Sequence, residues 1–159
     1  MITAAIVKEL RDKTNAGMMD CKRVLTETNG DIEASIKLLR ERGIAKAGAK
    51  ADRAANEGII AARVSPAISG ILLEINCETD FVSKNKNFQA FVNEVADVLA
   101  ATGAPDHAAA LAVPHGESNL EDYIKSKVIE VGENLQFRKY VRFVAAPGGV
   151  IASYIHMGG

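Results

Sequence analysis

Two kinds of hydrophobic periodicity divide the chain. Over residues 1–43, apolar side chains recur every three or four positions in three short blocks, separated by turn formers at 14–17 and 29–30. This spacing predicts three helices that each bury one face, and therefore a small three-helix bundle. The side chains expected to face its core are Ile6, Val7, Leu10, Met18, Cys21, Val24, Leu25, Ile32, Ile36 and Leu39.

The ends of these helices are marked by residue type. Thr3 and Asp31 precede the first and third blocks and are suitable N-caps, because their side-chain oxygens accept from free backbone amides. Gly43 is expected to end the third helix. Residues 44–56 are rich in alanine and carry scattered basic side chains, which predicts a partly helical linker between domains.

The periodicity changes from helical to alternating after the linker. Residues 58–64 and 70–77 read as two strands joined by a turn at Ser65-Pro66, and residues 135–143 read as a third strand. Helices are expected after Asn87, with Phe88, Phe91, Val92, Val95 and Leu99 inward, and after the capping pair Ser118 and Glu121. Residues 57–146 therefore predict an antiparallel three-stranded sheet packed with helices, and the whole chain an α+β fold.

The third strand carries a specific prediction about its faces. Leu135, Phe137, Val141 and Phe143 alternate with polar residues, so all four are expected on the core side. Gly149–Ser153 then repeats the pattern of Gly58–Ala62. Residues 147–159 are therefore interpreted as the start of a second core half that is truncated.

Composition narrows the class of protein. Nineteen basic and twenty acidic residues leave a formal charge of −1, so no global field favours nucleic acid. No run approaches the roughly 20 apolar residues that span a bilayer, and a signal peptide is not recognisable. These features predict a cytoplasmic protein that binds neither nucleic acid nor membrane. Cys21 and Cys77 are expected to be buried small hydrophobes rather than a disulfide.

Motifs for catalysis are missing from the sequence. There is no phosphate-cradling loop, dinucleotide fingerprint, nucleophile elbow or metal-ligand spacing. We therefore expect no catalytic residue, no metal, no cofactor and no small-molecule substrate. His107 and His115 are expected to be solvated, and an enzyme that uses Cys77 as its nucleophile remains a minor alternative.

A strand-to-helix turn at residues 76–85 is the strongest candidate for function. Thr79 is a suitable N-cap for a short helix, Asp80 suits its first turn, and Phe81 follows. Phe81 either packs into the local core or protrudes with Thr79, Asp80 and Val82 as a tip for a partner. The adjacent Met18 and Met19 cannot both face the bundle core, so one is expected outside, where it either suits a partner surface or is exposed without a role.

Two motifs then carry a family resemblance. They are TNAGMMDCK over residues 14–22, followed by NGD at 29–31, and NCETDFV over 76–82. With them, the chain resembles bacterial translation elongation factor Ts, the family of guanine-nucleotide exchange factors for elongation factor Tu. The family usually has glycine at the position of Asn15, and asparagine also tolerates a left-handed backbone. The resemblance implies a module similar to ubiquitin-associated domains over 1–43, followed by the first half of the family's core.

The resemblance also implies roles for individual residues. Thr79, Asp80, Phe81 and Val82 would approach the nucleotide-binding domain of GDP-bound or nucleotide-free elongation factor Tu and disturb its magnesium site. Met18 and Met19 match positions that contact the same domain, and His156 matches one directed at the partner's third domain. Typical members continue into a second core half, a coiled coil and a final helix. The rival interpretation is an adaptor whose helical module binds ubiquitin-like or helical ligands.

Overall fold

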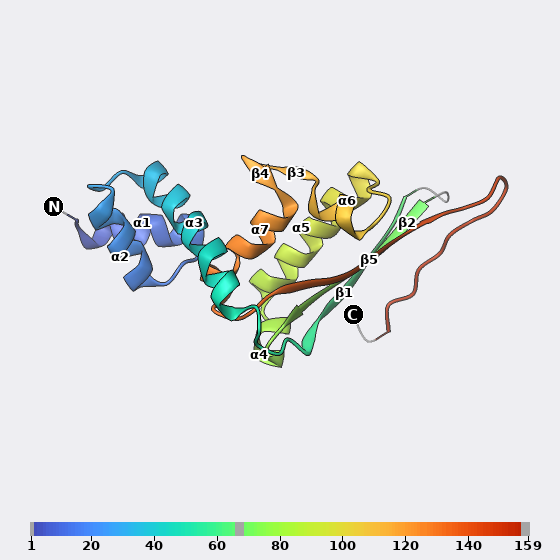
Figure 1. Cartoon of the computed structure of the whole chain (residues 1–159), viewed down its shortest axis with the longest axis horizontal. Helices are drawn as coiled ribbons and strands as arrows, with labels where there is room; N and C mark the ends of the chain where they lie inside the picture. The colour runs from blue at the N-terminus through green and yellow to red at the C-terminus, as the bar shows by residue number, and fades with distance from the viewer. Residues whose placement is uncertain (1, 66–68, 157–159) are drawn as a thin grey trace. The chain divides into compact units, whose positions relative to one another are not determined.

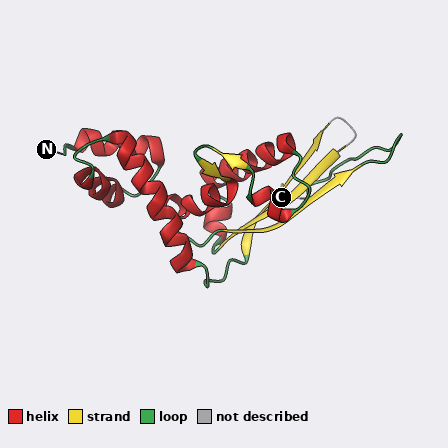
Figure 2. Ribbon diagram, turned by 45° about the horizontal axis from the view of Figure 1, so that its top comes forward, coloured by secondary structure: helices red, strands yellow, loops and turns green. Residues whose placement is uncertain are grey.

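A computed structural model describes residues 2–65 and 69–156, and these form two compact units. The first unit contains residues 1–53 and 122–134, and the second contains 54–121 and 135–159. Helices dominate the first unit, and an antiparallel sheet with helices forms the second (Figures 1 and 2). The predicted α+β class is confirmed.

Three helices build most of the first unit, with the caps that the sequence predicts. They are α1 (Ala4–Thr14), α2 (Met18–Glu27) and α3 (Ile32–Lys50). Thr3 accepts from the amide of Ile6 and Asp31 from that of Ala34, which confirms both N-caps. Asn15 ends α1 at φ 51°, so asparagine takes the left-handed conformation at this turn.

The core of the first unit corresponds closely to the expected apolar faces. Its fully buried members are Leu10, Ala16, Cys21, Val24, Leu25 and Leu39, and Ile129 of α8 (Val128–Val131) packs against them. Met18 is the exception, since its side chain is 58% exposed although its spacing predicted a core position. The similarity of this unit to ubiquitin-associated domains stays an expectation.

Helix α3 does not end at Gly43, contrary to the sequence prediction. It runs on through the alanine-rich stretch to Lys50, because alanine and lysine favour helix and Gly43 is held by a close contact. A Cβ atom placed on Gly43 would lie 2.8 Å from Cα of Ser126 and closer still to its carbonyl oxygen. Gly43 is therefore a packing residue in the middle of a helix.

Residues 122–134 lie with the first unit, although the sequence placed them with the sheet. Asn134 is buried, and its amide nitrogen donates to the carbonyl oxygens of Ala51 and Arg53 at 3.4 and 2.8 Å. These hydrogen bonds satisfy two backbone carbonyl groups just after the end of α3. Sequence periodicity gives no sign of such long-range polar contacts, which explains the misplaced boundary.

The second unit is organised around a three-stranded antiparallel sheet in the order β1-β2-β5. The strands are β1 (Glu57–Ser65), β2 (Ser69–Cys77) and β5 (Gln136–Val144), which confirms the predicted hairpin and third strand. Glu57 pairs with Cys77, and Ser69 pairs with Val144. Pro66 of the expected turn lies outside the described residues.

The faces of β5 differ from the prediction because of a β-bulge. The pairing passes from Glu74 with Lys139 to Ile75 with Phe137, so Arg138 is the extra residue. A bulge reverses the alternation of side chains beyond it. Tyr140 consequently enters the core and donates to the carbonyl oxygen of Ala104, whereas Phe143 is 46% exposed.

One face of the sheet is covered by α5 (Lys86–Thr102), as Figures 1 and 2 show. Its five predicted inward side chains are all buried. Asn85, rather than Asn87, is the N-cap, accepting from the amides of Asn87 and Phe88, and Gly103 ends the helix at φ 64°. The predicted helix is therefore correct and begins two residues earlier than expected.

The connection after α5 contains a short helix and two short strands, α6 (His107–Leu111), β3 (Pro114–His115) and β4 (Ser118–Asn119). Helix α7 (Leu120–Ser126) follows, where the sequence predicts a helix near Ser118 and Glu121. His107 is half-buried, bonds the carbonyl oxygen of Phe137 at 2.9 Å and stacks on its ring. Nε2 of His115 lies 3.5 Å from the carboxylate oxygen Oε1 of Glu94. Both histidines were expected to be solvated, and both have tertiary partners instead.

Candidate partner-binding site

The segment that connects β2 to α5 forms a single exposed turn of helix, α4 (Asp80–Ser83), at one end of the sheet (Figure 1). Thr79 is its N-cap, with the hydroxyl oxygen accepting from the amide of Val82 at 3.4 Å. None of the α4 residues is buried. The local sequence therefore forms the predicted helix start and holds it at the surface.

Phe81 points away from the protein at the centre of this turn. Its side chain is 84% exposed, whereas Thr79, Asp80 and Val82 are partly covered. The alternative in which the ring packs into the local core is therefore wrong. A large aromatic side chain in water at a fixed position gains free energy when a partner buries it, by about 2–3 kcal/mol for full burial.

The tip, defined as residues 79–82, is held between two anchored elements. On one side, the buried thiol of Cys77 donates to the carbonyl oxygen of Thr79 at 3.3 Å. On the other side, Asn85 caps α5, and the adjacent Phe88 is buried beneath it. Within the turn, the Ser83 hydroxyl donates to the carbonyl oxygen of Asp80 at 3.1 Å. Hydrogen bonds on both flanks and within the turn therefore hold the backbone that carries Phe81.

Asp80 and Lys84 form an ion pair along one side of the tip. Lys84 Nζ lies 2.6 Å from Asp80 Oδ2, and the side chain of Lys84 is largely exposed whereas that of Asp80 is about half exposed. The hydrogen bond and charge of Lys84 hold the pKa of the Asp80 carboxyl below its ordinary value, and Asp80 raises the pKa of Lys84. Asp80 is therefore ionised at neutral pH and its negative charge lies beside the exposed ring.

This ion pair makes the tip sensitive to acid. Because the pKa of Asp80 is lowered in the folded chain, the pair contributes fully above the ordinary pKa of 3.8 and is lost as pH falls through the lower folded pKa. We expect an NMR titration of the side-chain carboxyl carbon to give Asp80 a pKa below 3.8, and Lys84→Gln to return that pKa toward 3.8.

Glu27 provides an internal control for the titration. Arg42 lowers the pKa of the Glu27 carboxyl through a hydrogen bond in the first unit. Lys84→Gln should leave the pKa of Glu27 unchanged. An Asp80 pKa that does not respond to Lys84→Gln would contradict the assigned cause.

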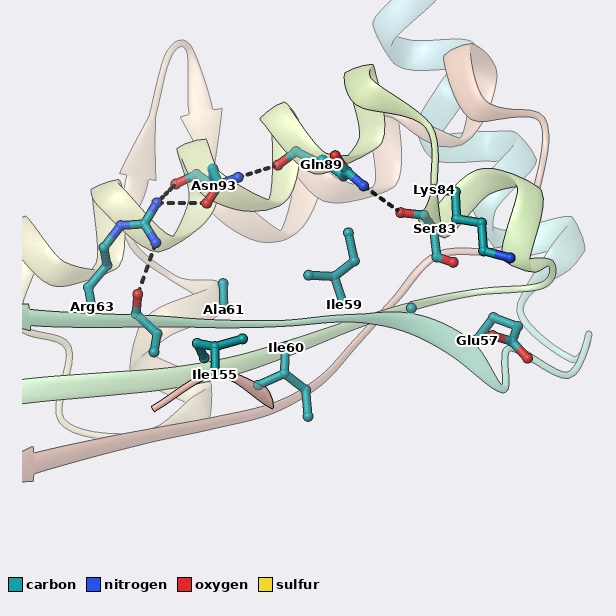
Figure 3. A pocket seen from close by; sticks show the side chains of 12 residues that line it. Glu57, Ile59, Ile60, Ala61, Arg63, Ser83, Lys84, Gln89, Asn93 and Ile155 are labelled. Carbon is teal, nitrogen blue, oxygen red and sulfur yellow. Dashed lines mark hydrogen bonds between the residues drawn. The ribbon is translucent and has the colours of Figure 1, made fainter. Parts of the chain in front are cut away.

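A polar clamp around Arg63, near the end of β1 that lies away from the tip, fixes α5 to this edge strand (Figure 3). Arg63 of β1 donates through Nε to Asp97 at 2.5 Å and through Nη2 to Asn93 Oδ1 at 2.9 Å. Further along the helix, Gln89 Nε2 reaches the carbonyl oxygen of Ser83 at 3.4 Å, directly behind the tip. The sequence offered no signal for this clamp, because its members are ordinary surface residue types on two separate elements.

A second exposed apolar surface lies on the first unit. Met18 and Met19 are 58% and 70% exposed, so neither enters the bundle core. They line a groove of about 540 Å³ with Ile2 and Val7, and three basic side chains (Lys8, Arg11 and Lys22) and one acidic side chain (Asp12) stand around it. Methionine side chains adapt their shape to a partner at small cost, and the net positive rim favours an acidic partner.

Two further candidate residues, His156 and Cys77, lie outside these two surfaces. His156 is exposed, and its Nδ1 lies 3.4 Å from the hydroxyl of Tyr154. Cys77 is buried behind the tip, away from solvent that a reactive nucleophile would need.

Among residues 2–65 and 69–156, no three His, Cys, Asp or Glu side chains gather as a metal site. No helix within these ranges is long and apolar enough to cross a bilayer.

The fold and the two exposed surfaces define an α+β scaffold that carries large apolar side chains in water at two places, Met18 and Met19 on the first unit and Phe81 on the second. Comparison with known proteins gives the family. The family model described as elongation factor TS matches residues 78–159, which include the tip. The chain therefore belongs to the elongation factor Ts family.

Individual relatives extend the similarity over the whole chain. It is 46% identical to elongation factor Ts of Thioalkalivibrio sulfidiphilus over 98% of this chain and 53% of that protein. It is 50% identical to elongation factor Ts of Azorhizobium caulinodans over 98% of this chain and 50% of that protein. The chain thus spans about half the length of the curated relatives it matches.

Proposed function

We propose that this chain is a translation elongation factor that binds elongation factor Tu and promotes release of its GDP. The observation that carries the proposal is the exposure of Phe81, at 84%, on a rigidly held turn inside the segment that matches the family. In this proposal the chain catalyses no covalent step. It acts through binding and conformational coupling.

The proposed mechanism combines what the family resemblance implies about the partner with the physical properties of the tip. Phe81 enters a gap between helices of the partner's nucleotide-binding domain, and burial of the ring stabilises the partner state in which that gap is open. The Asp80 carboxylate arrives beside it and, with the ring, disturbs the site that holds magnesium. Loss of the magnesium contacts weakens GDP binding, and by linkage GDP weakens binding of this chain by the same factor.

The other two surfaces contribute binding rather than exchange. The methionine groove of the first unit contacts the same nucleotide-binding domain, and His156 contacts the partner's third domain. Contacts on one chain act at a high effective concentration once the first has formed, so each raises the lifetime of the complex. GDP-bound and nucleotide-free elongation factor Tu are the two states that the chain meets.

A binding experiment tests the partner directly. Immobilised chain is mixed with elongation factor Tu, with and without excess GDP, and the retained partner is quantified. We expect retention that falls as GDP is added, because the two ligands oppose each other. Absence of retention in both conditions would overturn the proposal, as would retention that GDP leaves unchanged.

Met19→Asp tests the groove of the first unit separately. A carboxylate at this position would lose its water when an apolar contact forms, so binding to elongation factor Tu should weaken at least about tenfold. Isothermal titration calorimetry measures the change. Thermal unfolding should be nearly unaffected, since Met19 is 70% exposed in the free chain.

Ubiquitin is the comparison ligand for the same surface. If Met18 and Met19 belong to an adaptor for ubiquitin-like proteins, their NMR signals should shift on titration with ubiquitin. We expect no shifts with ubiquitin and clear shifts with elongation factor Tu. The opposite result would favour the adaptor and contradict the role assigned to the groove.

A further inference from the structure

The sulfur-containing side chains of this protein differ sharply in their access to solvent. Cys21 and Cys77 are fully buried, whereas Met18 and Met19 are exposed on the first unit. The two other methionines of the sequence lie outside the described residues. Within residues 2–65 and 69–156, Met18 and Met19 therefore hold the sulfur atoms that a dissolved reagent reaches.

Helix α2 carries both kinds of sulfur within one turn, because Cys21 follows Met18 by three residues. Cys21 faces the bundle core, where its thiol donates to the carbonyl oxygen of Ala16 at 3.7 Å and burial raises the pKa of the thiol. A cysteine reacts as its thiolate, which burial disfavours. A methionine thioether has no proton to lose, so its reactivity depends on exposure. This order reverses the usual one, and an oxidant meets the methionines first.

The surroundings of the two methionines favour an oxidised form. Lys8, Arg11 and Lys22 stand around the methionine groove, and such side chains donate hydrogen bonds without accepting any. A thioether is a weak acceptor, whereas a sulfoxide has a polar oxygen that accepts readily. The basic side chains at the groove can therefore hold the oxygen atoms that oxidation adds beside them.

We propose that Met18 and Met19 are reversible oxidation sites, at which a peroxide converts the methionine groove from an apolar surface into a polar one. The sulfur lone pair attacks one oxygen of hydrogen peroxide, so that an S–O bond forms and the O–O bond breaks. The transferred oxygen gives its proton to the departing hydroxide, which leaves as water. Sulfur loses two electrons and the peroxide gains them. A sulfoxide reductase reverses the change with a dithiol, which becomes a disulfide while the oxygen leaves as water.

Oxidation at these positions leaves the helical unit folded, because neither side chain belongs to its buried core. The effect falls on binding instead. A sulfoxide keeps its water in the free chain and loses it when an apolar contact forms, so the groove binds its partner less tightly. This consequence for elongation factor Tu rests on the proposed function, whereas the oxidation itself does not.

Peptide mapping of the folded chain tests the oxidation sites without any partner. The chain is treated with hydrogen peroxide, catalase stops the reaction, and trypsin then releases residues 14–22, which contain both methionines and Cys21. We expect one added oxygen on each methionine and a Cys21 thiol that still reacts with an alkylating reagent after denaturation. The thermal unfolding midpoint should stay the same. In urea, where the core is open, Cys21 should be oxidised as well.

Calorimetric titration with elongation factor Tu then measures the consequence. Affinity should fall at least about tenfold after oxidation. It should return after treatment with the two sulfoxide reductases, one for each sulfoxide epimer. The matched control is the double variant Met18→Leu, Met19→Leu, which keeps apolar side chains but has no thioether at the groove. Peroxide should leave its affinity at the value measured before treatment, and an equal loss in this variant would place the effect outside the groove.

Three results of the mapping would overturn the inference: unmodified methionines in the folded chain, oxidation of Cys21 as fast as that of Met18 and Met19, or unfolding that accompanies the sulfoxides. Unchanged affinity after complete oxidation would overturn the effect on the groove. If the untreated chain fails to bind elongation factor Tu, the proposed function fails, and the peptide map still decides the oxidation sites.

Discussion

Phe81→Ala is expected to slow the release of GDP that this chain stimulates from elongation factor Tu by at least about tenfold. Burial of a phenylalanine side chain contributes about 2–3 kcal/mol, and every 1.4 kcal/mol corresponds to a factor of about ten. In the proposed mechanism, that free energy is gained only in the partner state with the disturbed magnesium site, so the loss falls on the release step. Stopped-flow fluorescence of a labelled GDP measures it.

Phe81→Leu is the matched variant for this experiment. It keeps an apolar side chain at the tip and should retain more of the stimulated release than alanine does. Because the ring is 84% exposed, neither change should alter the free energy of unfolding by more than about 0.5 kcal/mol. Equal stimulation by the Phe81→Ala variant and the unchanged chain would exclude the wedge mechanism.

The chain's own stimulation is the reference for that comparison. If the unchanged chain binds elongation factor Tu but leaves GDP release at its spontaneous rate, exchange by this chain is excluded and binding stands. Binding to elongation factor Tu reports the affinity of the surfaces, and the rate of GDP release reports the effect of the tip.

Gly43→Ala is expected to destabilise the helical unit by at least about 1 kcal/mol, although alanine is the better helix former. The added Cβ would meet the backbone of Ser126, with only 2.8 Å to its Cα, and backbone cannot move aside as a flexible side chain can. Overpacking of this kind costs about 1–3 kcal/mol. Hydrogen exchange of the amides in α1 to α3 reports the loss locally.

Gly48→Ala, on the same helix, should have the opposite sign. A Cβ on Gly48 would meet nothing within 4 Å, so the substitution changes only helix propensity. Alanine then stabilises α3 by about 0.5–1 kcal/mol relative to glycine. Because the same substitution is made at both positions, the difference in stability between the two variants reports the close approach of the Ser126 backbone to Gly43. Equal effects at both positions would show that Gly43 is not needed for packing.

Local periodicity was sufficient for most elements of the fold. Phe88, Val92 and Leu99 are buried on α5 as their spacing predicts, because one helical face must leave water whatever it packs against. Thr3, Asp31 and Thr79 cap helices because capping depends on amides only two or three residues away. Interactions over such short distances are visible in a sequence.

Features that depend on distant residues were not visible. The sequence predicts a helix end at Gly43 because glycine usually ends helices, and only the approach of Ser126, far along the chain, explains a glycine within α3. Regular alternation with polar residues predicts Phe143 on the core side. The bulge at Arg138, set by pairing with β2, places it on the sheet face opposite α5.

The candidate tip shows the same division. By itself, the sequence determined that residues 79–82 begin a short helix between a buried strand and a buried helix, and its motifs matched the elongation factor Ts family. It left open whether Phe81 lies inside or outside, because an isolated aromatic at a turn has no periodicity that assigns it to a face. Tertiary structure decided this: Cys77 and Asn85 fix the two ends of the turn, α5 already fills its side of the sheet, and the ring of Phe81 is left in water.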